Sequence, residues 1–182
     1  MKRVVWKEGD VVLLKLNEKL FTVGQMLTAP YMLFFQLDST NGIISGVDLN
    51  EVPELFIVPV ANNFLQARGI EKIKKGVIPK RSVRVPVLWI QAKLWPRGEF
   101  VWKGGDLVRI DPEKGDLGIN NPIVKRDISA NDRDTLEKYE LTNVWTDHPL
   151  TPRLVVSIRE GRNFDPLKEK IFFGKDSHGI MG

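Results

Sequence analysis

The sequence predicts an α+β fold that is mainly β: a twisted antiparallel sheet or a small barrel, accompanied by one or two short helices. Two observations predict it. Runs of six to eight residues rich in β-branched and aromatic side chains recur through the first sixty positions, separated by turn-forming residues. One later segment combines capping residues with apolar side chains at helical spacing.

The early strands follow one another closely. The loop Asn17-Glu18-Lys19 is short enough for a hairpin. In the third strand apolar side chains point to both faces, so we expect that strand to be central and covered on both sides. Pro59 cannot donate to a ladder and places the fourth strand near a sheet edge or near its own end. Such hairpins also fit a small SH3-like barrel. The four strands are expected over 11–16, 20–27, 31–37 and 55–60.

Two helices are expected in the remainder. A short one covers 62–68, where asparagine can cap the start and Gly69 ends it. A second covers 129–141, with Ser129 as the cap and Leu136 facing the core. We expect the polar segment 72–81 to be an exposed loop. Further strands are expected over 83–94, 100–102, 107–110, 154–158 and 171–173.

The 182 residues are enough for one domain with its own core, and the apolar content of 42% argues against disorder. We therefore expect a single domain over 1–182. Its strand-rich core would cover 1–110, and a C-terminal extension over 111–182 would carry one helix and pack on the same core.

The residue inventory disfavours catalysis and metal binding. The chain has no cysteine and two histidines, His148 and His178, so thiolate sites are excluded and a binuclear hydrolytic site would lack ligands. A triad built on His148 and Asp147 is disfavoured, because adjacent residues in an extended chain point to opposite sides. We expect no catalytic residue, no metal and no cofactor.

Two further observations indicate the cellular location of the protein. No apolar run approaches the ~18 residues needed to cross a bilayer. The N-terminal residues have charge but no apolar stretch of signal-peptide length. We expect a cytoplasmic protein without a membrane partner.

Charge is concentrated in the middle of the chain. Residues 61–103 hold ten basic and two acidic side chains, whereas the whole chain has a net charge of +4. Tryptophans lie among these cations, and aromatic faces beside cations suit both nucleobase stacking and protein interfaces. Trp95 stands beside proline and glycine, so we expect it in an exposed loop. The predicted binding residues are Trp95, Arg97, Trp89, Trp102, Arg81, Arg84 and Lys93.

The opening of the chain carries a family-like pattern. A glycine-aspartate turn leads into the first strand at Gly9-Asp10-Val11, and a glycine recurs within the second strand at Gly24-Gln25-Met26. Gly24 is expected to allow a bulge or a close backbone approach in that strand. Apolar positions between them are Leu14, Leu16 and Phe21. Over about residues 6 to 75 the chain resembles the immunity protein 26 family of bacterial polymorphic-toxin systems.

The resemblance implies an intracellular antitoxin that binds and blocks a cognate toxin, without cofactor or catalysis. We therefore expect a non-catalytic protein-binding module, an immunity protein whose partner is a toxin. Two alternatives stay open. One is a nucleic-acid-binding domain that uses segment 61–103, and the other is a small hydrolase, since some relatives carry a phosphotriesterase label.

Overall fold

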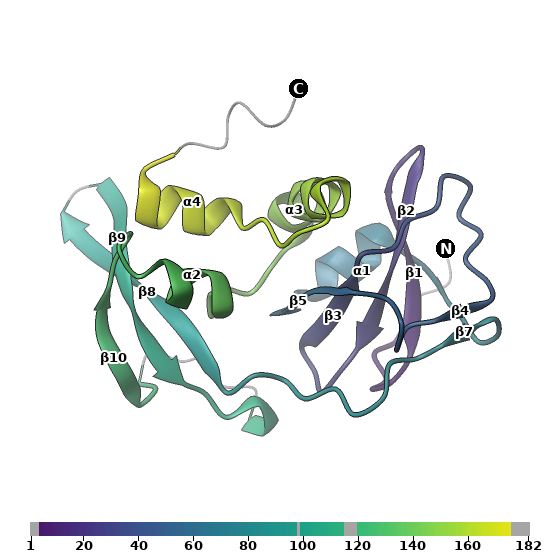
Figure 1. The fold of residues 1–182 in the computed structure, drawn as a ribbon, viewed down its shortest axis with the longest axis horizontal. Coiled ribbons are helices and arrows are strands. Elements are labelled where there is room, and N and C mark those ends of the chain that lie inside the picture. Colours follow the sequence, from purple (N-terminus) through teal and green to yellow (C-terminus); the bar gives the residue numbers. More distant parts are fainter. Residues whose placement is uncertain (1–3, 98, 115–119, 176–182) are drawn as a thin grey trace. The chain divides into compact units, whose positions relative to one another are not determined.

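The structure, a computed structural model, describes residues 4–97, 99–114 and 120–175, without the side chains of 94–103 (Figure 1). The chain forms two compact units. Unit 1 consists of Met1–Val85 and Val144–Phe164, and unit 2 of Pro86–Asn143 and Asp165–Gly182. Each unit is therefore assembled from two separate stretches of chain. The expectation of a single domain over 1–182 stays a prediction.

Unit 1 contains a five-stranded antiparallel sheet with the order β5-β3-β2-β1-β6. Every residue of β3 is buried and the strand has a partner on each side, which confirms the predicted covered strand. The fourth predicted strand, β5, lies at an edge, as Pro59 indicated. The strands are β1 (Val11–Asn17), β2 (Leu20–Met26), β3 (Tyr31–Phe35), β5 (Glu54–Pro59) and β6 (Gly69–Lys72).

Two helices and a small parallel pair complete unit 1. Helix α1 (Asn62–Arg68) confirms the predicted short helix and buries Phe64 and Leu65. Helix α3 (Asp147–Glu160) contacts α1 and β1. Strands β4 (Val47–Asp48) and β7 (Val77–Ile78) pair in parallel.

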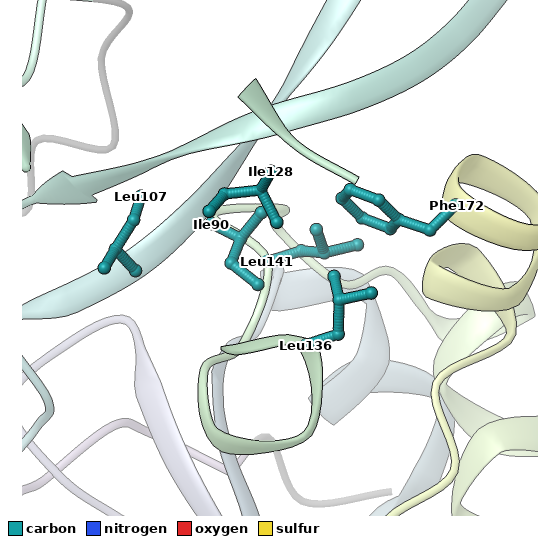
Figure 2. Packing of buried hydrophobic residues seen from close by; sticks show 6 residues of the cluster. All are labelled: Ile90, Leu107, Ile128, Leu136, Leu141 and Phe172. Atoms are coloured by element: carbon teal, nitrogen blue, oxygen red, sulfur yellow. The ribbon is translucent and has the colours of Figure 1, made fainter. Parts of the chain in front are cut away.

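Unit 2 has a three-stranded antiparallel sheet with the order β10-β9-β8. Its helices supply Leu136 and Phe172 to a core cluster that also contains Ile90, Leu107 and Ile128 from the sheet, together with Leu141 (Figure 2). The elements are β8 (Leu88–Arg97), β9 (Glu99–Arg109), the 3-10 turn η1 (Pro112–Lys114), β10 (Ile123–Ile128), α2 (Arg133–Lys138) and α4 (Pro166–Phe173).

The predicted fold class is confirmed: the protein is α+β, mainly β, with antiparallel sheets. In the described part of the chain the sheets are open and do not close into the SH3-like barrel that was the alternative. Four α-helices are described where one or two were expected. None of the described helices is long and apolar enough to cross a membrane.

Two predicted strands are wrong. Residues 154–158 lie within α3, and 171–173 lie within α4. A short apolar run fits a strand and a buried helix equally well, so flanking residues decide. The Asp165 carboxylate accepts hydrogen bonds from the backbone amides of Leu167 and Lys168 and so caps the start of α4. Gly174, with a φ of 65°, ends that helix. The segment 72–81, expected as a loop, contributes Lys72 to β6 and 77–78 to β7.

Candidate functional site

The structure places Trp89, one of the predicted binding residues, in the core. Its side chain is fully buried, and its indole nitrogen donates to the Pro86 carbonyl oxygen at 2.6 Å. A buried indole with a satisfied donor cannot meet a partner at the surface. Trp89 is therefore not available as a binding residue at the surface.

Lys93 is neutralised within unit 2. Its ammonium group lies 2.8 Å from a carboxylate oxygen of Asp106 and 2.5 Å from one of Asp127. The hydrogen bond to Asp106 makes the largest contribution to raising the pKa of Lys93, and the hydrogen bond to Asp127 raises it further. The Asp106 carboxylate also accepts the backbone amide of Asp127 at 2.8 Å. Two carboxylates of the same unit therefore compensate the charge of Lys93.

The remaining predicted residues are divided between the units. Arg81 and Arg84 are exposed and belong to unit 1. Trp95, Arg97 and Trp102 belong to strands of unit 2, and their side chains lie outside those that the structure describes. Of the predicted set, therefore, only the two arginines are described as exposed side chains.

Asp147 and His148, weighed above as a catalytic pair, open helix α3. The Asp147 carboxylate accepts hydrogen bonds from Arg68 at 2.5 and 3.1 Å and from the Thr151 hydroxyl at 2.9 Å. The hydrogen bonds from Arg68 lower the pKa of Asp147. This carboxylate joins α1 to α3. Among the described residues no group of three or more His, Cys, Asp or Glu side chains could hold a metal ion.

A groove of about 770 Å³ lies beside strand β6 in unit 1. Six consecutive residues, 70–75, form one side of it. Val4 and Val5 near the N-terminus and the loop 42–44 contribute further lining, with Leu13 from β1. The groove thus gathers four stretches of the chain, all from one compact unit.

The groove exposes large aliphatic side chains. Ile43 is 71% exposed and Val5 is 63% exposed, the two highest values among the large hydrophobic residues described. Both line the groove. Single exposed aliphatic residues are common on soluble proteins, but their concentration in one concavity is typical of a binding surface.

The same groove has basic residues along one side. Lys72 pairs with Asp10 at 2.6 Å, whereas Lys74 and Lys75 are exposed and form no ion pair within the described residues. Glu71 is the one acidic residue of the lining. In the described sheet, β6 pairs with β1 alone and is therefore an edge strand. An edge strand offers backbone donors and acceptors to an incoming chain.

Sequence reasoning identified part of this site. The basic segment 61–103 contains Lys72, Lys74 and Lys75. The run Ile70-Glu71-Lys72-Ile73 has no two-residue alternation, and the lysines and glycine that follow it are typical of a loop, so strand β6 had no clear local signal. No local pattern shows that residues near positions 5 and 43 meet this segment.

Comparison with known proteins identifies a family. The model of a family described as a domain of unknown function, DUF8309, matches residues 1–175. No curated protein and no solved structure matches the chain.

Proposed function

The chain belongs to the DUF8309 family of unknown function, and we propose that it is a non-catalytic protein-binding module that receives its partner in the groove of unit 1. The exposure of Ile43 and Val5 within that one concavity carries the proposal. A monomeric surface gains nothing from gathering uncovered aliphatic side chains in a hollow, whereas an interface does.

The energetics favour a macromolecular partner. Covering an exposed aliphatic side chain contributes about 1.5–3 kcal/mol. Two such side chains, Ile43 and Val5, therefore offer enough free energy to act as anchors of an interface. The lining beside these anchors includes Leu13 of β1 and residues 70–72 of β6, so the five-stranded sheet forms part of the groove.

The specific role that we propose is neutralisation of a bacterial toxin in the cytoplasm. The resemblance to the immunity protein 26 family supports it, since the resembling segment, about residues 6 to 75, includes Leu13, the loop 42–44 and residues 70–75 of the groove. An antitoxin of this kind acts by covering its target, so it requires a recognition surface and no reacting group.

Growth rescue tests the proposal. The full chain is co-expressed with each product of a neighbouring gene that arrests growth when expressed alone, as wild type, as Ile43→Asp and as Ile123→Asp. Ile123 is the matched control, because it is a 41% exposed isoleucine of unit 2 that is no part of the groove. We expect wild type and Ile123→Asp to restore growth and Ile43→Asp to fail. Equal rescue by both variants, or no rescue by wild type, contradicts the proposal.

A further inference from the structure

We infer that the groove takes its partner as an extended acidic segment, which adds to the sheet as a strand beside β6. The inference rests on the proposed protein-binding function and names the chemistry of the partner at that same site. Three features of the described residues carry it: the free edge of β6, the run of six consecutive residues along one side of the groove, and the charge along that side.

The register of β6 shows which backbone groups face outward. The Ile73 amide donates to the Val11 carbonyl oxygen at 2.8 Å, so position 73 bonds toward β1. Lys72 lies opposite Val12. Hydrogen-bonded and non-hydrogen-bonded pairs alternate along an antiparallel ladder. The Lys72 amide and carbonyl therefore face the outer edge, away from β1.

The residues on the other side of the groove do not pair with this outer edge. Among the described residues, no backbone hydrogen bond joins β6 to Val4, Val5 or the loop 42–44. The backbone groups of Lys72 thus lie beside an apolar hollow and have no strand partner on that side. Addition of a strand from another chain would satisfy these groups.

One side of the groove follows the chain from β6 onward. Six consecutive residues, 70–75, line it: the first three, 70–72, belong to β6, and 73–75 follow the strand. Side chains of a bound strand alternate between two faces. One set can enter the hollow beside Val5, Ile43 and Ile44 while the other set faces outward. A helix would fill the hollow but would leave the β6 edge without hydrogen bonds.

The charge of the groove indicates which side chains the partner strand carries on its outward face. Lys74 and Lys75 are exposed and have no ion pair in the described part of the chain, and Glu71 is the one acid of the lining. Acidic side chains on the partner would meet these lysines, and electrostatic complementarity of this kind increases specificity and association rate. The expected segment therefore alternates aliphatic and acidic residues.

The variant Lys72→Pro isolates the edge contact. Proline removes the outward amide hydrogen and spares the ladder bonds to β1, which positions 71 and 73 make. Lys72→Ala is the matched control, because it also removes the lysine side chain and its ion pair with Asp10 but keeps the amide. Thermal unfolding of both variants shows whether unit 1 stays folded.

The probe is a displayed library of random peptides of roughly 12 residues, enough to span the groove in extended form. The full chain is the target, and Ile43→Asp is used to remove peptides that bind elsewhere. We expect the retained peptides to alternate aliphatic and acidic residues. We also expect Lys72→Pro to bind them about tenfold more weakly than Lys72→Ala does.

Backbone N-methylation of one retained peptide, position by position, gives a readout that does not depend on a protein variant. Strand addition predicts loss of binding at every second position. If the peptides depend on Ile43 but show no two-residue period, or bind Lys72→Pro and Lys72→Ala equally, the strand mode is wrong and the protein-binding function stands. Retention of no Ile43-dependent peptide overturns the inference, and growth rescue then decides the proposed function separately.

Discussion

Arg153 is the charged residue most fully enclosed in unit 1. It has no exposed surface, its guanidinium carbon lies 3.9 Å from the centre of the Phe56 ring and 4.5 Å from that of Trp145, and it donates to Asn163 Oδ1 at 2.8 Å. A desolvated guanidinium between two aromatic faces is strongly held, and its stem also fills core volume. Arg153 therefore links α3 to strand β5 and to the segment that precedes the helix.

We predict that Arg153→Ala lowers the free energy of unfolding by about 3–5 kcal/mol, because it removes the stacked cation and leaves a cavity. Urea unfolding followed by circular dichroism measures the change. Arg159→Ala is the matched control on the same helix: that side chain is exposed and pairs with Glu160 at 3.7 Å, so its loss should change the value by about 0.5 kcal/mol or less. A small effect of Arg153→Ala would show that α3 keeps its place beside Phe56 and Trp145 without the Arg153 side chain.

Single glycines show how far local sequence reasoning reaches. Gly9 has a φ of 83°, which favours glycine, and it forms the predicted turn into β1. Gly24 was predicted to allow a bulge or a close backbone approach. A Cβ there would instead lie 2.6 Å from the sulfur of Met32 and 3.3 Å from a methyl carbon of Leu14. The need for glycine was predictable, but the side chains that impose it come from neighbouring strands and were not.

Between helices, the ion pair of Arg68 with Asp147 sets a pH dependence. The hydrogen bonds from Arg68 lower the pKa of Asp147 below its ordinary value of 3.8. A carboxylate with a lowered pKa in the folded state stabilises the fold above its unfolded pKa, and the contribution is lost as pH falls through the folded value. The pair therefore contributes fully at neutral pH and decreasingly below about pH 4.

We predict that Asp147→Asn costs about 1–2 kcal/mol at neutral pH, a value that reflects the partial exposure of both partners. The difference from wild type should shrink as pH is lowered below about 4. Urea unfolding across this pH range measures it. Glu18→Gln is the control, since that carboxylate is 89% exposed and pairs with Lys15 alone. A difference that is constant with pH would contradict the assigned role of the Arg68 bonds.

Elements were predictable where short apolar runs and turn chemistry agreed. The hairpin of β1 and β2 has two apolar strands joined by a short polar turn, and both strands were predicted almost to their ends. Helix α3 was not predicted, because Pro149 and Pro152 within its sequence argue against a helix. The four-residue spacing of Leu150, Leu154 and Ile158, all buried, was the signal available for it.

In the molecule as a whole, the chain passes between the two units more than once. Unit 1 includes 144–164 with α3, and unit 2 includes α4. Loss of the chain after position 143 would remove Trp145 and Arg153 from one core and Phe172 from the other. Each unit would then lose part of the apolar surface that packs in its core.

We predict that a fragment of residues 1–143 has no cooperative thermal transition and aggregates, because it exposes both sheets. Differential scanning calorimetry on the fragment and on the full chain measures the transition. A cooperative melt of the fragment at the temperature of the full chain would show that α3 and α4 are dispensable for folding.

The candidate site was predictable in its charge and not in its apolar part. The excess of lysine and arginine over 61–103 includes the lysines beside β6. Ile43 and Val5 reach the same groove only through the fold, since no local periodicity relates them to one another. Trp89 shows the converse: its place within the basic segment indicated a surface role, but the core of unit 2 encloses it.

The proposal that unit 1 binds a partner through its groove is tested by the dissociation constant of the complex between the full chain and a growth-arresting product of a neighbouring gene. Isothermal titration calorimetry on wild type, Ile43→Asp and Ile123→Asp gives the three values. We predict that Ile43→Asp binds about tenfold more weakly or worse, a loss of about 1.4 kcal/mol or more, while Ile123→Asp binds as wild type does. Equal affinity of the two variants would contradict the groove as the binding surface, and absence of binding by wild type would contradict the proposed partner.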